Sequence, residues 1–368
     1  MSGDAQALAN AATRTLRAYD PGHDLPRLRR EVGKDLVELG SNENSLGPSP
    51  AALAAARAAL DEAFRYPDPK GGALKGALAA RFGVDARQVT LGNGSHELLM
   101  LLAQCFAEPG TSVVYSQYGF AVFAIATAAA GAQALCVPAL PRDHAQAPLG
   151  HDLEAMAAAV RGDTRLVYLA NPNNPTGTWF GVAELAAFLA RVPETTLVVA
   201  DEAYGEYLDA PGTASATSLL ARHANLVVTR TFSKAYALAG LRVGYALSAP
   251  GVAAVLERLR ESFNVNGPAL AAAAAALDDE AHMRRGCAET ARERDWLQVE
   301  LRRRGLRTFP SQTNFLLVDF ARDAAEIERR LFAHAVVVRP MAGYGLPTCL
   351  RITVGTRAEN RRLLEALA

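Results

Sequence analysis

The sequence predicts an α/β protein: a larger, doubly wound domain with a mainly parallel sheet, followed by a smaller α+β domain. Two observations carry this prediction. Short, continuous apolar runs bounded by turn residues alternate with helical stretches, which is typical of parallel strands buried on both faces. After about Glu261 the pattern changes to a long helix rich in Arg and Glu, followed by further strands. A chain of 368 residues is long enough for about two domains.

The elements follow in order along the chain. We expect helices at residues 51–64, 72–82, 97–107 and 281–304, and a helix followed by a strand within residues 121–140. The expected strands are 89–91, 112–115, 166–170, 197–200, 226–229, 315–319, 336–339 and 350–354. We therefore predict an N-terminal arm (1–40) that packs on the small domain or on a partner subunit, a large domain (41–260) and a small domain (261–368).

Composition excludes several classes of protein. Lys and Arg number 38, as do Asp and Glu, so the net charge of zero argues against a nucleic-acid binder and against a polybasic membrane-surface protein. The first ten residues are polar and acidic, and the Ala-rich stretch 121–140 is poor material for a membrane span. The four cysteines form no CxxC pair and no HExxH occurs, so we expect a cytoplasmic protein without a metal site.

Four polar segments directly follow expected strands. Ligands of an open parallel sheet bind beyond the carboxyl ends of the strands, so we expect these segments to meet at one site. The segments are GNGSHE (92–97), NPNNPTG (171–177), DEAY (201–204) and the stretch 229–244, which contains TRTFSKAY and AGLRVG.

Each segment also has a purely structural explanation. In the first, two glycines and the N–H groups of Ser95 and His96 are typical of an anion site at a helix start, but Ser95 and Glu97 also suit an ordinary helix N-cap. The third glycine of a dinucleotide-binding fingerprint is missing there. The second segment can be a rigid turn, and Asp201 can cap the next helix. Taken singly, these alternatives stay open.

The last segment carries the most specific chemistry. Lys234 follows a strand and a hydroxyl-rich turn formed by Thr231 and Ser233, and Arg242 comes eight residues later. A single lysine is usually a solvated surface residue. Here an amine stands beside a set of anion-binding groups, and Asp201, at the end of a buried strand, needs a cationic partner. Together these groups describe a pyridoxal-phosphate site.

The ordered motifs resemble those of a known family. GNGSHE, NPNNPTG, DEAY, TFSKAYALAGLR and LRITVG, preceded by LGSNENSLGPSP, are similar to the motifs of fold-type I, class I/II pyridoxal-phosphate-dependent aminotransferases, and more narrowly of histidinol-phosphate aminotransferases. The resemblance runs from about Tyr19 to the C-terminus. Two departures concern the substrate: His96 stands where many relatives carry Asp, and residues 115–120 lack the prolines common there.

The resemblance implies a role for each matching residue. Lys234 would form the Schiff base with the cofactor aldehyde, Asp201 would pair with the ring nitrogen, and Tyr204 would bind the ring hydroxyl. The further cofactor contacts would be Asn174 at the ring hydroxyl, Phe120 on the ring face, and Ser95, His96, Thr231, Ser233 and Arg242 at the phosphate. Tyr66 would reach the phosphate of a neighbouring subunit, which implies a homodimer. The substrate would contact Tyr19, Asn44, Arg339 and Arg351.

The implied reaction is ping-pong transamination between histidinol phosphate and 2-oxoglutarate in histidine biosynthesis, with Lys234 as general base and then acid. An aromatic amino-acid aminotransferase shares every cofactor residue and is the main alternative. A threonine-phosphate decarboxylase, or a binding protein that kept the fold without activity, is a further one.

Overall fold

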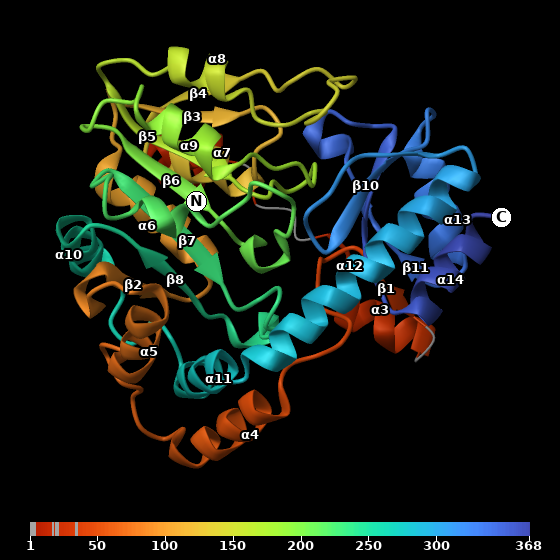
Figure 1. Cartoon of the computed structure of the whole chain (residues 1–368), viewed down its shortest axis with the longest axis horizontal. Helices are drawn as coiled ribbons and strands as arrows, with labels where there is room; N and C mark the ends of the chain where they lie inside the picture. The colour runs from red at the N-terminus through yellow and green to blue at the C-terminus, as the bar shows by residue number, and fades with distance from the viewer. Residues whose placement is uncertain (1–4, 17, 19–21, 34–35) are drawn as a thin grey trace.

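The computed structural model describes the chain except residues 1–4, 17, 19–21 and 34–35. It has a larger and a smaller domain, and the long helix α12 (Glu280–Arg303) runs from the first into the second (Figure 1). The α/β class expected from the sequence is confirmed. No helix in the described part of the chain is both long and apolar enough to cross a membrane.

A seven-stranded sheet forms the centre of the larger domain. Strand β8 runs antiparallel to both of its neighbours, and all other pairs along the sheet are parallel. In spatial order the strands are β2 (Val89–Gly92), β8 (Gly244–Leu247), β7 (Leu226–Thr231), β6 (Leu197–Asp201), β5 (Thr164–Ala170), β3 (Ser112–Ser116) and β4 (Gln133–Val137). The sequence did not predict β8, because four residues between a glycine-rich turn and a helix carry little periodic signal.

Both faces of this sheet are covered, which explains the unbroken apolar runs of its strands. Successive residues of β6 show the alternation: Val198 and Ala200 belong to one apolar cluster, and Val199 to the other. The first cluster is shared with α4 (Pro50–Ala59), α5 (Gly72–Phe82), α8 (Leu153–Ala158), α9 (Val182–Leu189) and α11 (Gly267–Asp278). The second is shared with α6 (Ser95–Phe106), α7 (Ala121–Ala129) and α10 (Pro250–Leu259).

The smaller domain is built on a second sheet with the antiparallel order β12-β13-β10-β9. Its strands are β9 (Arg307–Thr308), β10 (Phe315–Asp319), β12 (Arg339–Pro340) and β13 (Cys349–Thr353), and its helices include α13 (Ala324–Ala333) and α14 (Arg357–Ala366). A short parallel pair joins β1 (Val37–Glu38) to β11 (Val336–Val337). Val37 and Leu39 thereby enter the core of the smaller domain.

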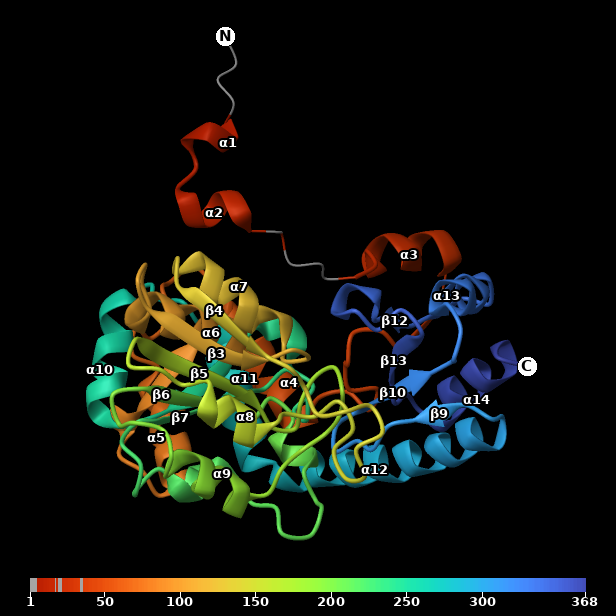
Figure 2. The same ribbon diagram turned by 90° about the horizontal axis from the view of Figure 1, so that it is seen from above.

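The N-terminal region contains α1 (Ala5–Leu8), α2 (Ala11–Thr15) and α3 (Leu25–Val32); α3 lies over the smaller domain beside α13 (Figure 2). Short 3₁₀ turns complete the fold: η2 (Leu60–Glu62), η3 (Ala86–Gln88), η4 (Gly205–Tyr207), η5 (Ala216–Leu219), η6 (Ala239–Leu241) and η7 (Ala342–Tyr344). We expected the small domain to begin at residue 261, yet α11 packs in the core of the larger one. The division into three parts remains a prediction.

Candidate active site

A cavity of about 310 Å³ lies where the carboxyl ends of the parallel strands face the smaller domain. The structure brings together there most of the residues singled out from the sequence: Ser95, His96, Phe120, Asn174, Asp201, Tyr204, Thr231, Ser233, Lys234, Arg242 and Arg351. They come from strand ends, helix starts and connecting loops that are far apart in the sequence. This convergence is what the parallel topology predicts.

One end of the cavity is formed by a helix start and two glycines. Gly94, in the left-handed region at φ +81°, precedes α6 and caps it without a side-chain hydrogen bond. A Cβ at Gly94 would lie 2.4 Å from Nη2 of Arg242, and one at Gly244 would lie 2.6 Å from the backbone nitrogen of Ser95. Only glycine therefore lets the guanidinium and the helix start approach each other so closely. Both attract an anion.

Two hydroxyls from the end of β7 complete this anion-binding end. The Thr231 hydroxyl donates to Oγ of Ser233 at 2.9 Å and accepts from its backbone N–H at 3.1 Å. Nη1 of Arg242 donates to the same Ser233 oxygen at 3.4 Å. Burial, and then the positive charge of Arg242, lower the pKa of His96, which favours the uncharged imidazole at this end of the cavity.

Lys234 lies on the wall of the cavity. Its Nζ donates to the backbone carbonyls of Asn42 at 3.1 Å and of Ser41 at 3.3 Å. Burial, followed by the charges of Arg351 and Arg242, lowers the pKa of its amine to about 7. A large fraction of this amine is therefore neutral near pH 7, as a nucleophile or a general base requires.

Asp201 is the last residue of β6 and only 4% exposed. Its Oδ1 accepts a hydrogen bond from the Thr229 hydroxyl at 2.8 Å, and burial raises the pKa of its carboxyl to about 7. Within the described residues, no cationic side chain forms an ion pair with it. A buried carboxyl beside a cavity, without a cation, fits a ligand that brings its own N–H⁺ group.

The opposite end of the cavity is closed by the smaller domain. Nη1 of Arg351, from β13, donates to Oδ1 of Asn174 at 2.7 Å, and its Nη2 donates to the carbonyl of Gly40 at 2.6 Å. Tyr204 is buried beside them, and its phenol oxygen accepts from Nδ2 of Asn42 at 2.8 Å. A fork-shaped guanidinium in this place suits a carboxylate or a phosphate.

Three expected residues that the structure describes do not line this cavity: Asn44, Arg339 and Tyr66. Asn44 instead donates to the backbone carbonyls of Lys234 at 3.4 Å and Ala235 at 3.1 Å, and so holds the turn that carries the lysine. Arg339 is the register partner of Arg351 between β12 and β13, so both side chains leave the sheet on one face. Its guanidinium lies directly against Gly22. Tyr19, also expected at the substrate, lies outside the described residues.

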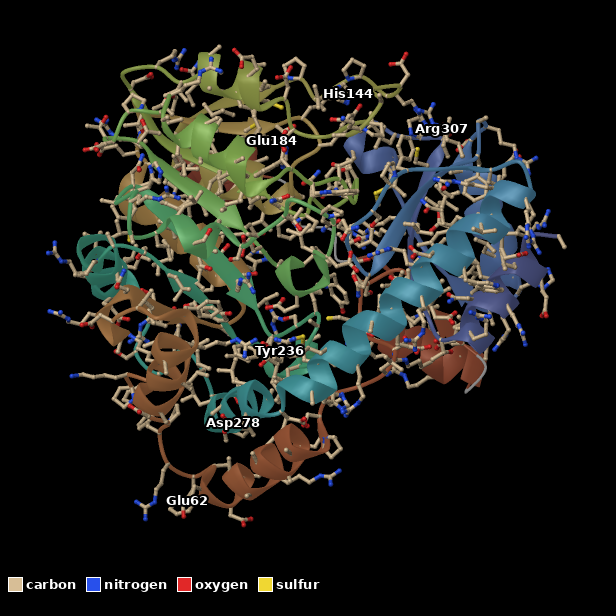
Figure 3. The ribbon with its side chains drawn as sticks, viewed as in Figure 1. Glu62, His144, Glu184, Tyr236, Asp278 and Arg307 are labelled. Atoms are coloured by element: carbon tan, nitrogen blue, oxygen red, sulfur yellow. The ribbon has the colours of Figure 1, made fainter. Side chains whose placement is uncertain are left out.

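Tyr66 is the third of these residues and is 82% exposed. Its ring stacks on Phe263, with ring centroids 4.6 Å apart. The segment that carries Tyr66 lies at the outer edge of the larger domain, where Figure 3 labels Glu62. Tyr66 therefore does not reach the cavity of its own chain.

Part of the cavity wall was not predicted from the sequence. Ser41, Asn42 and Glu43 line it, in a segment that we call the strap (residues 41–44) because it crosses between the two domains. The strap lies inside the motif LGSNENSLGPSP, so a signal was present. With two asparagines at i and i+2, the sequence could not show that Asn42 faces the cavity and that Asn44 faces the backbone of Lys234.

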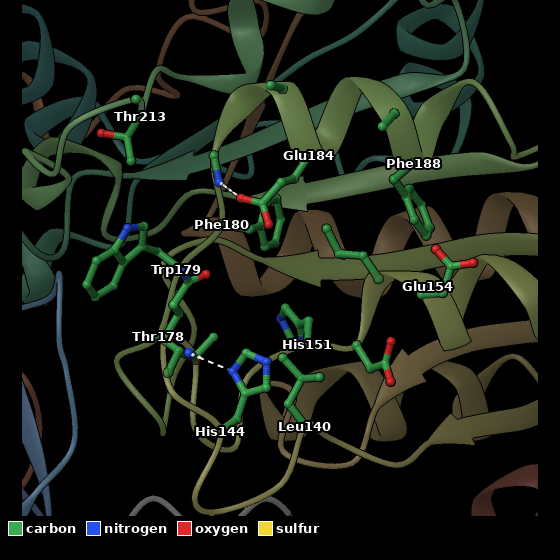
Figure 4. A pocket seen from close by; sticks show the side chains of 18 of the residues that line it. Leu140, His144, His151, Glu154, Thr178, Trp179, Phe180, Glu184, Phe188 and Thr213 are labelled. Carbon is green, nitrogen blue, oxygen red and sulfur yellow. Dashed lines mark hydrogen bonds between the residues drawn. The ribbon is translucent and has the colours of Figure 1, made fainter.

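A second hollow, of about 960 Å³, lies between α8, α9 and the loop before α8 (Figure 4). None of the residues expected at the site lines it. Its polar groups already serve the fold: Glu184 accepts from the N–H of Gly181 at 2.7 Å, Glu154 pairs with Arg191, and Nε2 of His151 lies 3.0 Å from the carbonyl oxygen of Ala170. Size alone therefore does not identify the site.

The smaller cavity fits one cofactor at three points. Lys234 suits an aldehyde, the buried carboxyl of Asp201 suits a protonated ring nitrogen, and the Ser95–Arg242 end suits a phosphate. A doubly wound domain with this set of groups defines a pyridoxal-phosphate enzyme.

The comparisons with known proteins define the family. Residues 34–367 match the family described as aminotransferase class I and II. The chain is 51% identical over 371 residues to histidinol-phosphate aminotransferase 2 of Pseudomonas aeruginosa, covering 99% of this chain and 98% of that protein. It is 50% identical to histidinol-phosphate aminotransferase 1 of Thiobacillus denitrificans, covering 98% and 93%.

A solved structure agrees with these relatives. The crystal structure of histidinol-phosphate aminotransferase from Sinorhizobium meliloti, in complex with pyridoxal-5'-phosphate, matches with a TM-score of 0.86 and 34% identity, over 98% of this chain and 96% of that one. The chain belongs to the class I and II aminotransferases, so it is a transferase that uses pyridoxal 5'-phosphate.

Proposed function

We propose that this aminotransferase transfers the amino group of histidinol phosphate to 2-oxoglutarate, as a step of histidine biosynthesis. The observation that carries the proposal is the match over nearly the whole of both chains, at about half identical residues, to relatives named for this activity. The cavity supports it, because Arg351 offers positive charge to an anionic donor. Arg339 is its register partner on the same face of the sheet, outside the cavity lining, and we propose that it adds positive charge at this end.

Each cavity residue has a proposed task toward the cofactor. Asp201 holds the ring nitrogen protonated, and Tyr204 with Asn174 binds the ring hydroxyl. Phe120 covers the ring face. The phosphate would be held by Ser95, His96, Thr231, Ser233 and Arg242. When bound, pyridoxal phosphate supplies an aldehyde for the amino group and a ring that accepts the electron pair left by the Cα proton.

Lys234 moves the proton in this proposal. Its amine, with a pKa of about 7, would take the Cα proton of the amino donor as general base and then, as general acid, deliver a proton to the cofactor carbon that carried the aldehyde oxygen. The strap carbonyls of Ser41 and Asn42 keep the amine beside the cavity until then. Water would release the oxo product while the amino group stays with the cofactor, and Lys234 would move the proton in the reverse direction when 2-oxoglutarate takes up that amino group.

We also propose a cytoplasmic homodimer. Tyr66 supports the dimer: it is a large exposed ring on the outside of the domain, in a motif whose family counterpart reaches the neighbouring subunit's cofactor phosphate. The cysteines support the compartment, since Cys105, Cys136, Cys287 and Cys349 are all free thiols.

The experiment that tests the substrate compares kcat/KM for histidinol phosphate and for phenylalanine, each with 2-oxoglutarate. Histidinol phosphate has a phosphate and no carboxylate, so we expect the Arg339→Ala variant to lose roughly 30-fold with it, as for a lost charged hydrogen bond, and less with phenylalanine. Arg361→Ala, exposed on α14, is the control and keeps both values. A preference for phenylalanine of about tenfold or more in the unmodified enzyme identifies an aromatic aminotransferase instead.

A further inference from the structure

The backbone carbonyl of Asn42, in the strap, holds Lys234, but its side-chain amide has no role in the function proposed so far. It is 1% exposed and adopts a left-handed backbone conformation at φ 56°. Asparagine tolerates this conformation, often because its side chain bonds to its own local backbone. Here the side chain reaches other elements instead. It therefore does more than shape a turn.

The smaller domain holds the backbone of Asn42 in place. Its N–H donates to Oγ1 of Thr353, on β13, at 2.9 Å, and its carbonyl accepts from Nδ2 of Asn314 at 3.0 Å. The Thr353 hydroxyl in turn donates to Oδ1 of Asn42 at 3.3 Å, which fixes the orientation of the amide. With the oxygen turned toward Thr353, the amide nitrogen is directed toward the larger domain.

In that direction Asn42 meets two groups of the active site. Its Nδ2 donates to the phenol oxygen of Tyr204 at 2.8 Å, and its carbonyl accepts from Nζ of Lys234 at 3.1 Å. The side chain thus serves the tyrosine, while the backbone serves the lysine. One residue links a strand of the smaller domain to both.

We propose that Asn42 is a positioning residue for transamination. Its amide fixes the position of the Tyr204 phenol relative to the smaller domain, and thereby the position of the cofactor ring hydroxyl that Tyr204 binds. The inference rests on the proposed role of Tyr204. A donated bond to the phenol oxygen stabilises negative charge on it, so Tyr204 becomes a better hydrogen-bond donor to the ring hydroxyl.

The test uses Asn42→Gly, which keeps the left-handed backbone and the carbonyl but removes the amide. We expect the dissociation constant of pyridoxal phosphate for the cofactor-free protein to rise roughly 3- to 10-fold, as for one lost hydrogen bond. The pH midpoint of the visible absorbance of the bound cofactor should also shift. In a Tyr204→Phe background the same change should have no further effect on either quantity.

Two controls separate this role from a structural one. Asn266→Gly makes the same substitution at the N-cap of α11 and should leave both quantities unchanged, because Asn266 lies outside the cavity. The chain has four lysines (Lys34, Lys70, Lys75 and Lys234), so the pH dependence of acetylation at Lys234 can be followed by peptide mass spectrometry. This pH dependence should be the same in Asn42→Gly as in the unmodified protein, because the backbone carbonyl of residue 42 that accepts from Lys234 remains.

The outcomes distinguish the two proposals. Equal cofactor affinity in Asn42→Gly and the unmodified protein, or an equal loss in the Tyr204→Phe background, overturns the role of Asn42. An unmodified protein that binds no pyridoxal phosphate overturns the proposed function itself. The Asn42→Asp variant adds a check on direction: it turns a donor into an acceptor and should weaken binding at least as much as glycine.

Discussion

Two consecutive acids at the end of β6, Asp201 and Glu202, face different parts of the molecule. Glu202 is 1% exposed and fully paired: Oε2 accepts from Nη2 of Arg230 at 2.6 Å and from the Ser215 hydroxyl, and Oε1 accepts from the N–H of Ala216. Arg230 also pairs with Glu206 at 2.9 Å. Asp201, one residue earlier, lines the cavity, and among the residues that the structure describes its side chain accepts a hydrogen bond from one other side chain, the Thr229 hydroxyl.

The difference shows how one strand end serves both the fold and the chemistry. A buried carboxylate that is paired within the chain cannot serve a ligand, and the loss of its partner destabilises the fold, whereas a buried carboxylate without a cation is costly until a ligand supplies one. The raised pKa of Asp201 expresses that cost. We therefore expect changes on the cavity side to affect activity, and changes in the Glu202–Arg230 cluster to affect stability.

The largest effect is expected on the cavity side at Lys234. Lys234→Ala should reduce transamination by roughly 10³-fold or more, because the group that moves the Cα proton is gone. Far-ultraviolet circular dichroism should be unchanged. Lys75→Ala, which removes a lysine paired with Glu257 away from the cavity, is the control and should stay active. Borohydride reduction followed by peptide mapping should place the cofactor on Lys234; a label on another lysine contradicts the assignment.

Asp201→Asn should have the next largest effect. The amide has the same shape but carries no charge for the ring nitrogen, so kcat should fall roughly 100-fold or more while the cofactor still binds. Steady-state kinetics with saturating cofactor and saturating concentrations of both substrates measure this loss. Turnover close to that of the unmodified enzyme is incompatible with the role proposed for Asp201.

In contrast to Asp201→Asn, Glu202→Gln should lower the stability of the protein and leave its activity nearly unchanged. It removes one partner of the buried Arg230, so the free energy of unfolding should fall by about 2 to 4 kcal/mol, while kcat stays within about threefold. Urea unfolding of the cofactor-free protein, together with the standard assay, measures both quantities. If Glu202→Gln loses activity as strongly as Asp201→Asn, the two acids do not differ as proposed.

The smallest effect concerns the pH dependence of the free energy of unfolding. The folded protein raises the pKa of Asp201 from 3.8 to about 7, so between these values the folded state holds a proton that the unfolded state has lost. Stability contributed by Asp201 is therefore present at low pH and is lost as pH rises toward 7 and above. Relative to Asp201→Asn, the cofactor-free protein should lose about 2 to 3 kcal/mol of unfolding free energy between pH 5 and 8. If the unfolding free energies of the unmodified protein and of Asp201→Asn change with pH in the same way, this prediction is wrong.

Much of the fold could be read from the chain because its signals are local. The helix expected at residues 72–82 is α5 as observed, and the strand expected at 315–319 is β10. The helix expected at 51–64 was too long, since α4 ends at Ala59 and passes into the 3₁₀ turn η2. Propensity and periodicity identify such elements, but they locate their ends only within a few residues.

The sequence by itself determined which residues gather at the strand ends, because a parallel sheet brings polar segments after successive strands to one edge. Lys234, Asp201 and Arg242 could be chosen on that ground. Only the tertiary structure decided which of two neighbouring acids meets Arg230, that Arg351 of the smaller domain reaches Asn174, and that Asn42 rather than Asn44 touches Tyr204. The physical reason is that these contacts depend on side-chain packing in the folded protein, much of it between two domains. Contacts between residues that are far apart in the chain produce no recognisable pattern of spacing in the sequence.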